Sequence, residues 1–297
     1  MENRIKETAS GPSITIVVGT LNRPQVVLRL IEQLIGASKK TPLEVLVIDQ
    51  SLAKDYFLLQ RQFPQMDQFV LIHFDKPNTC KYLNYGWMHA KAPIVLYLDD
   101  DVTITENTIP AHINAYDNGT IHVVAGRVIN DGEKITLDNR VGKVQWYGAG
   151  FTKNFSYEKN TYVDFPYGCN MSFRKQTLKE MKGFDEKLIP PIYAFNEVDL
   201  GYRISKRRKN SILFASGALV YHHQYKGGGT RNDFDRKEIV RSNNFNYGYF
   251  LGKNFSRWEN IICLLRRLPY QIMREPSAIF SIIRGLHAGE KNRPLSY

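Results

Sequence analysis

Residues 93–101 read PIVLYLDDD, an apolar run that ends in three consecutive aspartates. The run from Ile94 to Leu98 is the kind of segment that forms a strand buried on both faces of a sheet. Adjacent carboxylates at a strand end repel one another by about 1 kcal/mol or more per pair at surface-like dielectric. A divalent cation removes that repulsion, and hard oxygen ligands select Mg²⁺ or Mn²⁺. The alternative is a solvated acidic turn, which the apolar strand directly before the aspartates disfavours.

Two earlier apolar segments also end at polar residues. Residues 14–19 read ITIVVG and run into the polar loop 20–23, and residues 44–48 read EVLVI and run into Asp49. Residues 69–74 form a third segment of this kind. Because these segments are short and apolar, each is predicted to be a strand buried in a sheet.

Helical patterns separate the predicted strands. Pro24 lies where the first turn of a helix tolerates a missing N–H, and apolar residues recur at helical spacing as far as Ile35. A second helix is predicted from Tyr82 to Ala90. Alternating strands and helices predict an α/β fold with a mostly parallel central sheet and right-handed crossovers. In such sheets ligands bind outside the carboxyl ends of the strands. The polar residues expected to meet there are Thr20, Asn22, Arg23, Asp49, Asp99, Asp100 and Asp101.

The segment 196–203, NEVDLGYR, carries two acidic residues at the start of a helix predicted over residues 194–208. Glu197 and Asp199 diverge by about 200° around that helix, because each residue turns it by about 100°. The two therefore have different roles: one faces the cleft as a general base, and the other caps or anchors the helix. Acidic residues also stabilise a helix N-terminus through its dipole, and the pattern alone leaves open which of the two is the base.

His222 and His223 end a strand predicted over residues 218–223, and a glycine-rich loop from Lys226 to Arg231 follows. Side chains alternate along a strand, so only one of the two histidines faces a given side of the sheet. That histidine is either a structural hydrogen-bonding group or a metal ligand. Three consecutive glycines allow backbone N–H groups to approach phosphate oxygens, and the loop is otherwise a flexible connection.

In this order and spacing, the segments resemble family 2 glycosyltransferases, and especially the bacterial rhamnosyltransferase-like branch that builds surface polysaccharides. The resemblance covers about residues 13–231 and implies a GT-A fold, which is Rossmann-like. It also implies a metal-dependent, inverting transfer of a sugar from a UDP- or dTDP-sugar to a glycan or lipid-linked saccharide. The matching segments are IVVGTLNRP, VLVIDQS, the Asn84-containing stretch before IVLYLDDDV, GCNMSFRKQTLKEMKGFDEKL, NEVDLGYRI and ALVYHH.

The resemblance implies roles for individual residues. Asp101 and His222 would hold the metal on the diphosphate. Glu197 stands where the family's Glu-Asp pair places the catalytic base, one methylene longer than the usual Asp, and Asp199 is the reserve candidate. The residues expected to border the donor sugar or the acceptor are Trp146, Gly168 and Asn170. The residues expected to bind the nucleotide-sugar, with Asp49 on the base and Asp99 near the ribose, are Thr20, Asn22, Arg23, Asp49, Asn84, Asp99, Asp100 and Arg231.

Basic charge is concentrated in the last part of the chain. The whole chain carries +11, and residues 226–297 carry 13 Lys and Arg and 6 Asp and Glu, a net of +7. We expect a GT-A catalytic domain over residues 1–232 and a basic, mostly helical extension over residues 233–297. Its helices either dock on an anionic membrane that carries a lipid-linked acceptor, or pack on the catalytic domain or on a second subunit as a homodimer.

Composition and motifs weigh against other classes of protein. The three cysteines lack metal-like spacing, so we expect a cytoplasmic protein without a disulfide framework, placed at the inner face of the cell membrane if the extension docks there. A sugar-1-phosphate nucleotidyltransferase is the alternative enzyme, but GTLNRP is a poor version of its first loop. A nucleic-acid-binding protein is the non-enzymatic alternative, and without a recognition motif we expect no nucleic-acid partner.

Overall fold

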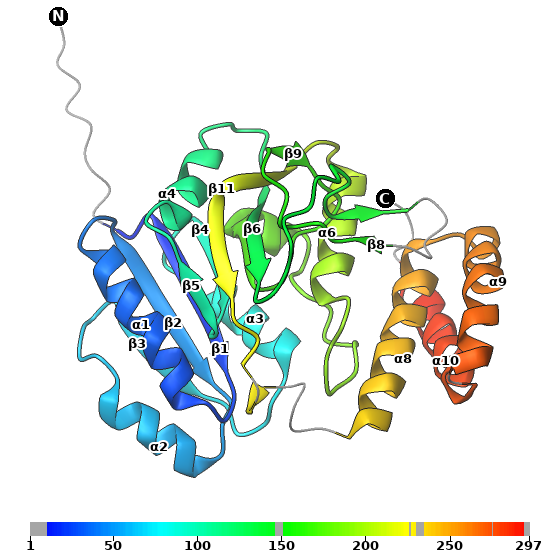
Figure 1. Cartoon of the computed structure of the whole chain (residues 1–297), viewed down its shortest axis with the longest axis horizontal. Helices are drawn as coiled ribbons and strands as arrows, with labels where there is room; N and C mark the ends of the chain where they lie inside the picture. Colours follow the sequence, from blue (N-terminus) through cyan, green and yellow to red (C-terminus); the bar gives the residue numbers. More distant parts are fainter. Residues whose placement is uncertain (1–10, 146–150, 226, 230–234, 275, 294–297) are drawn as a thin grey trace, which may run out of the picture.

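The computed structural model describes residues 11–145, 151–225, 227–229, 235–274 and 276–293. Within these residues, a nine-stranded sheet with the strand order β3-β2-β1-β4-β10-β6-β11-β5, and with β9 beside β11, crosses the middle of the molecule (Figure 1). The strands of this sheet are β1 (Ile14–Thr20), β2 (Leu43–Asp49), β3 (Phe69–His73), β4 (Ile94–Asp99), β5 (Val102–Ile104), β6 (Val123–Asn130), β9 (Thr161–Tyr162), β10 (Asn170–Arg174) and β11 (Ile212–His222). A separate ribbon pairs β7 (Lys143–Val144) with β8 (Phe151–Thr152).

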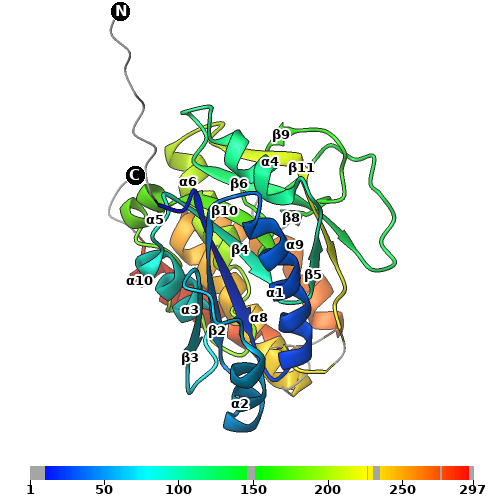
Figure 2. The same cartoon turned by 90° about the vertical axis from the view of Figure 1, so that its left-hand side faces the viewer.

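Helices cover both faces of the sheet. Figure 2 shows α1 and α3 on opposite sides of β1 and β2. The chain passes from β1 outward to β2 through α1, and from β3 back to β4, on the other side of β1, through α3. Right-handed crossovers in opposite directions place their helices on opposite faces of the sheet. The helices of this part are α1 (Pro24–Ser38), α2 (Ala53–Gln62), α3 (Thr79–His89), α4 (Thr108–Ala115), α5 (Lys175–Glu180) and α6 (Asn196–Arg207). The α/β fold with a mostly parallel central sheet is therefore confirmed.

The parallel strands bring their polar ends to one edge. In the register of the sheet, Thr20 of β1 lies opposite Asp49 of β2, and Asp49 lies opposite His73 of β3. On the other side of β1, Gly19 lies opposite Asp99 of β4. Since parallel strands end together, residues separated by as much as 80 positions in sequence share this edge.

The second half of the sheet reverses direction at β10. This strand runs antiparallel to β4 and β6, and β11 then runs parallel to β6 and antiparallel to β5. The two strands expected at 212–215 and 218–223 form one strand, β11, with a shift of register between Ala215 and Leu219. Its pairing with β5 sets His222 opposite Val102, directly after the three aspartates.

Three helices form the C-terminal extension and lie at one end of the molecule beside α6 (Figure 1). They are α8 (Arg236–Asn254), α9 (Arg257–Arg274) and α10 (Ser277–Lys291). None of the described helices is long and apolar enough to cross a bilayer. The expected domain boundary at residue 232 lies outside the described residues, and the division into two domains stays a prediction.

Glycines bring α8 and α10 into backbone contact. A methyl group added at Gly252 of α8 would lie 2.1 Å from the carbonyl oxygen of Leu286 on α10. A methyl group at Gly285 of α10 would lie 2.0 Å from the carbonyl oxygen of Phe245 on α8. The two backbones therefore lie closer together than any side chain at these positions would allow. The glycines recur every four residues on each helix, at Gly248 and Gly252 of α8 and at Gly285 and Gly289 of α10, which places them on the facing sides.

We expect Gly252→Ala to lower the free energy of unfolding by about 1–3 kcal/mol, because the added methyl group forces the two backbones apart. Gly36→Ala in α1 is the matched control, since nothing lies within 4 Å of the added atom. Alanine there raises helix propensity and should stabilise the protein by up to about 1 kcal/mol. Denaturant melts of both variants measure the difference, and equal stabilities would contradict the close packing of α8 and α10.

Candidate active site

Asp99, Asp101 and His222 come together at the carboxyl edge of the sheet. Each offers one possible ligand atom, and the three atoms lie within 4.8 Å of one another. His222 Nε2 lies 3.2 Å from Asp101 Oδ1 and 3.7 Å from Asp99 Oδ2. Asp101 and His222 are buried, whereas the side chain of Asp99 is 41 % exposed. A ligand can therefore approach the cluster from the side of Asp99.

The hydrogen bonds around His222 orient its ring for metal binding. His222 Nδ1 lies 2.8 Å from Asn130 Oδ1, an amide oxygen that also accepts from Gln224 Nε2 at 2.8 Å. Nδ1 is taken up by Asn130, so Nε2 faces Asp101 and Asp99. Burial acts to raise the pKa of the Asp101 carboxyl, but a hydrogen bond with His222 and the charge of Arg23 lower it overall. Two carboxylates and one imidazole are a set of ligands that suits Mn²⁺ or Mg²⁺.

Asp100 is 1 % exposed and is held by the loop that follows β1. Thr20 Oγ1 donates to Asp100 Oδ2 at 2.5 Å, and Arg23 Nε donates to the same oxygen at 2.9 Å. Arg23 Nη2 donates to Oδ1, and Nη1 reaches Asp101 Oδ2 at 3.2 Å. Burial raises the pKa of Asp100 to about 6, although Arg23 and Thr20 act in the opposite direction. Asp100 therefore joins the end of β1 to the end of β4 beneath the surface. The nucleotide contact expected for it stays a prediction.

Asn22 and Asp49 lie at the neighbouring strand ends, as expected. The N–H of Asn22 donates to Ser51 Oγ at 2.7 Å, and its Oδ1 accepts from the N–H of Leu52 at 3.1 Å. Asp49 Oδ1 accepts from the N–H of Ser51 at 2.5 Å. Asp49 Oδ2 is buried without a hydrogen-bond partner among the described residues, and burial raises the pKa of this carboxyl. The contact of Asp49 with a nucleotide base stays a prediction.

Glu197 lies in the first turn of α6 and faces Gly168. A methyl group added at Gly168 would lie 4.0 Å from the carboxyl carbon of Glu197, so the glycine leaves space in front of the carboxylate. Burial raises the pKa of the Cys169 thiol, and Asp99, Asp101 and Glu197 raise it further. The N–H of Asp99 donates to the Cys169 carbonyl oxygen at 3.4 Å, and Gly168 is the residue before Cys169. The segment 168–169 therefore lies between Glu197 and the strand end that carries the aspartates.

Asp199 is 1 % exposed and fully engaged. Its Oδ2 accepts from Arg203 Nε and from Lys253 Nζ, each at 2.9 Å, and its Oδ1 accepts from Asn254 Nδ2 at 2.9 Å. Burial alone would raise the pKa of Asp199, but the charges of Arg203 and Lys253 lower it overall. A buried carboxylate held ionised in this way neither reaches a substrate nor takes up a proton. Asp199 is thus an anchor of α6, and its role as the reserve base stays a prediction that these contacts do not favour.

The anchor of α6 extends into the C-terminal extension. Lys253 Nζ also donates to Asp185 Oδ2 at 2.6 Å, and the Tyr249 hydroxyl donates to the same oxygen at 2.8 Å. Sequence reasoning missed Lys253, Asn254 and Asp185. The only local signal was the four-residue spacing of Asp199 and Arg203, which is typical of an ion pair on one helix.

Asn84 uses all of its hydrogen-bonding capacity within the protein. Its Nδ2 donates to the Phe184 carbonyl oxygen at 2.9 Å and to Glu186 Oε1 at 2.8 Å. Its Oδ1 accepts from the N–H of Phe184 at 2.9 Å and from Trp87 Nε1 at 3.1 Å. Asn84 therefore holds the turn after α5. The donor contact expected for it stays a prediction.

Asn170 is also an internal residue. Its Nδ2 donates to the carbonyl oxygens of Arg127 at 3.0 Å and Ala218 at 2.7 Å, and its Oδ1 lies 2.8 Å from His112 Nε2. Burial lowers the pKa of His112 to about 4, so this histidine stays neutral. Asn170 links β10 to β6 and β11 inside the sheet. The contact with donor sugar or acceptor expected for it stays a prediction.

The glycine-rich loop packs beside the β1–α1 loop. The N–H of Gly229 donates to the Leu21 carbonyl oxygen at 2.9 Å, and a methyl group added at Gly229 would lie 3.3 Å from the Arg23 guanidinium. Positive φ angles at all three glycines explain why glycine is needed there. Arg231 and Trp146 lie outside the described residues, so their expected contacts stay predictions.

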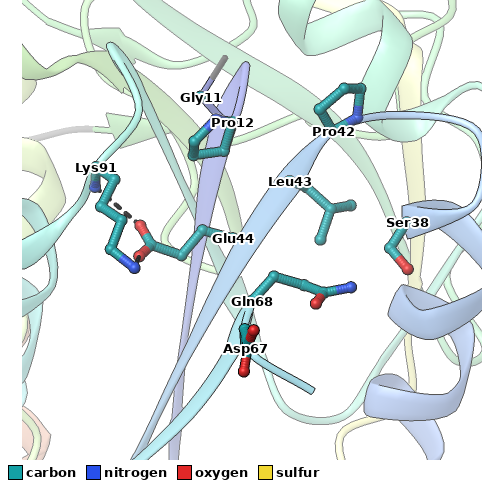
Figure 3. A pocket seen from close by; sticks show the side chains of 9 residues that line it. All are labelled: Gly11, Pro12, Ser38, Pro42, Leu43, Glu44, Asp67, Gln68 and Lys91. Carbon is teal, nitrogen blue, oxygen red and sulfur yellow. Dashed lines mark hydrogen bonds and ion pairs between the residues drawn. The ribbon is translucent and has the colours of Figure 1, made fainter.

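Two described cavities lie away from this cluster. One of about 530 Å³ opens at the starts of β1 and β2, at the opposite end of the strands from Asp49 (Figure 3). There the buried Glu44 accepts from Thr15 Oγ1 at 2.7 Å and from the N–H of Lys91 at 2.8 Å, and it lies 3.3 Å from Lys91 Nζ. The carboxylate of Glu44 thus joins the starts of β1 and β2 to Lys91. The possible metal ligands Asp99, Asp101 and His222 lie at the opposite edge of the sheet.

Comparison with known proteins agrees with the geometry. Residues 15–182 match the sequence profile of the family described as Glycosyl transferase family 2. A relative from Haloferax volcanii, named glucosyl-dolichyl phosphate glucuronosyltransferase, is 22 % identical over 233 residues. The aligned part is 75 % of this chain and 71 % of the relative.

Solved structures share the fold at low sequence identity. The mannosyltransferase PcManGT from Pyrobaculum calidifontis, in complex with GDP-Man and Mn²⁺, has a TM-score of 0.53 at 14 % identity, over 97 % of this chain and 77 % of that one. TarS of S. aureus has a TM-score of 0.59 at 13 % identity, over 95 % and 83 %. GalNAc-T7 with UDP, GalNAc and Mn²⁺ has a TM-score of 0.64 at 14 % identity, over 94 % and 55 %.

Lys253→Met is expected to lower the free energy of unfolding by about 3–5 kcal/mol, because it leaves two buried carboxylates with one cation fewer. The same change at Lys237, an exposed residue at the other end of α8, is the matched control and should change stability by less than about 0.5 kcal/mol. Thermal and denaturant melts measure both variants. Similar stabilities for the two variants would contradict the role of Lys253 in anchoring α6.

Proposed function

The chain belongs to glycosyl transferase family 2, and on that premise we propose that it moves a sugar from a nucleotide-diphosphate sugar to a hydroxyl group of a saccharide. One observation carries the proposal. The cluster of Asp99, Asp101 and His222 lies at the carboxyl edge of the parallel strands, and the segment Gly168–Cys169 contacts both Asp99 and the carboxylate of Glu197. A possible metal site for a diphosphate and a carboxylate able to accept a proton are the two chemical groups that such a transfer needs.

The cluster would hold Mn²⁺ or Mg²⁺ through Asp101, His222 and Asp99. A bound divalent cation would neutralise the charge that develops on the departing diphosphate. Two structural neighbours were solved with Mn²⁺, which supports the choice of metal. Arg23 contributes a fixed positive charge at the same edge, although its guanidinium is already paired with Asp100 and Asp101.

Glu197 is proposed to be the general base. Its carboxylate would take the proton from the acceptor hydroxyl, whose oxygen attacks the anomeric carbon opposite the leaving diphosphate. A single displacement of this kind inverts the anomeric configuration. The glycine at position 168 leaves the space in which a sugar hydroxyl can approach the carboxylate. The burial of Asp199 in ion pairs with Arg203 and Lys253 supports Glu197 over Asp199 for this step.

For the donor we propose a UDP- or dTDP-sugar. Asp49 would accept an N–H of the pyrimidine base at its buried, unpartnered Oδ2, and Asp99 would lie near the ribose. Both roles are those that the family resemblance implies. The sheet supports them, because Thr20, Asp49 and Asp99 end neighbouring strands.

For the acceptor we propose a glycan or lipid-linked saccharide in surface polysaccharide synthesis, within the rhamnosyltransferase-like branch. The relative from Haloferax volcanii, by its name, transfers to a sugar on a lipid phosphate, which supports a lipid-linked acceptor. Such an acceptor implies work at the inner face of the cell membrane. The alternative use of the extension, as the interface of a homodimer, is tested together with membrane docking below.

Glu197→Gln is expected to leave donor binding near normal and to lower the rate of transfer by at least about 10²-fold, because the amide cannot accept the proton. Glu32→Gln, at an exposed position of α1, is the matched control and should transfer at the rate of the unchanged chain. Transfer and donor binding are measured on each variant with the same nucleotide-sugar. Near-normal turnover by Glu197→Gln would remove this residue from the mechanism.

Asn130→Ala is expected to weaken Mn²⁺ binding by about 10–100-fold, because Asn130 fixes the ring of His222. Asp101→Asn should weaken it at least as much, whereas Asp117→Asn, at an exposed position, should leave it unchanged. Calorimetry on the metal alone gives the affinities. Added EDTA should stop transfer, and excess Mn²⁺ should restore it. Full activity in the chelator would count against a metal at this cluster.

A further inference from the structure

The outer side of α9 carries an exposed apolar stripe between two arginines. Trp258 is 77 % exposed and Leu265 is 65 % exposed, and both are among the largest exposed apolar side chains of the described residues. Figure 1 shows α9 at the outer edge of the C-terminal extension. We call this surface the α9 face, and its residues are Arg257, Trp258, Ile261, Ile262, Leu265 and Arg266.

Helix geometry gathers these side chains on one side. The apolar residues follow the spacing i, i+3, i+4 and i+7 from Trp258, which spans about 100° of the helix circumference. Arg257 and Arg266 project from either margin of that arc. The opposite side of α9 is the packed one, since Asn260 and Cys263 are buried there. The stripe therefore contributes nothing to the core of the extension.

We propose that the α9 face docks on the surface of an anionic lipid bilayer. Tryptophan and aliphatic side chains on one side of a helix enter the boundary between headgroups and acyl chains, and arginines at the margins pair with lipid phosphates. No described helix, α9 included, can cross a bilayer, so the helix would lie in the plane of the surface.

The charge of the extension favours this occupant over a second copy of the chain. Residues 226–297 carry a net charge of +7, and α9 alone has four arginines and one glutamate. A two-fold interface through the α9 face would bring the arginines of both copies together. An anionic surface meets the same arginines with opposite charge, and each basic group near it contributes about fivefold to binding.

Two contributions to binding act together in this docking: insertion of the apolar side chains and attraction of the arginines to anionic lipid. Apolar insertion alone gives marginal, reversible attachment, and the basic margins supply the second contribution. Docking through α9 would hold the catalytic part at the surface on which a lipid-linked acceptor is found. The docking itself does not depend on the transfer reaction, so it can be tested without a donor or an acceptor.

Flotation of the full chain with vesicles tests the proposal. Vesicles of phosphatidylcholine and phosphatidylglycerol in equal parts should carry the chain upward in a density gradient. Vesicles of phosphatidylcholine alone should carry much less, and high salt should weaken the anionic binding because it screens the arginines. Equal binding to both kinds of vesicle would overturn the charge part of the proposal.

Variants locate the contact. The double change Trp258→Ser and Leu265→Ser should lower binding to anionic vesicles by about tenfold or more, since binding scales with the apolar area inserted. The double change Arg257→Gln and Arg266→Gln should lower it by about fivefold for each arginine lost. Ile135→Ser with Leu137→Ser removes two exposed apolar residues from a loop of the catalytic part and is the matched control, with binding unchanged. Circular dichroism and melts confirm that each variant is folded.

Two results would overturn docking on lipid. One is unchanged flotation of the Trp258→Ser, Leu265→Ser variant, which would place the membrane contact elsewhere. The other is no flotation, together with a dimer in light scattering that this variant converts to a monomer, which would assign the α9 face to a second copy. Either result would leave the proposed sugar transfer standing, because that proposal is tested separately, by transfer with Glu197→Gln and by metal binding to Asp101→Asn.

Discussion

Three consecutive carboxylates at the end of a buried strand can exist only if the fold compensates each of them. Asp100 accepts hydrogen bonds from Thr20 and is paired with the charge of Arg23. Asp101 also contacts Arg23, and its other oxygen faces His222. Asp99 stays partly in solvent. The repulsion between the three carboxylates is thus reduced in a different way at each one: Asp100 is paired in the interior, Asp101 lies beside His222, and Asp99 is partly solvated. The loop after β1 and the end of β11 supply the groups that do this.

A second buried ionic network fixes the helix that carries Glu197. Asp199 lies two residues further along α6 and is bonded to Arg203 of the same helix and to Lys253 and Asn254 of α8. Removing water from such charges costs several kcal/mol per ion, and only close partners compensate for it. Two of these partners, Lys253 and Asn254, come from the C-terminal extension. The extension therefore helps to hold the helix that carries Glu197. The first turn of α6 cannot shift without breaking these bonds.

Several roles that looked equivalent in the sequence proved different in space. Asn84 and Asn170 lie in segments that resemble the family, and both turned out to hold backbone groups inside the protein. Glu197 and Asp199 are two residues apart, and the helix turns one toward Gly168 and the other toward α8. In each case the sequence predicted the type of polar residue at the position. It did not predict which way the side chain points, because that depends on partners far away in the sequence.

The sequence by itself determined the alternation of apolar strands and helices, the edge at which the strands end, and the residue types gathered there. Those features are local, since they follow from the periodicity of a segment and from what a carboxylate or a histidine can bind. The tertiary structure alone decided which of these carboxylates are buried in ion pairs, and that α8 supplies partners to Asp199. Lys253 and Asp199 are 54 positions apart. His222 ends β11, and Asp101 lies in the turn before β5, the strand with which β11 pairs. Pairings over such distances are set by packing, and no local pattern records them.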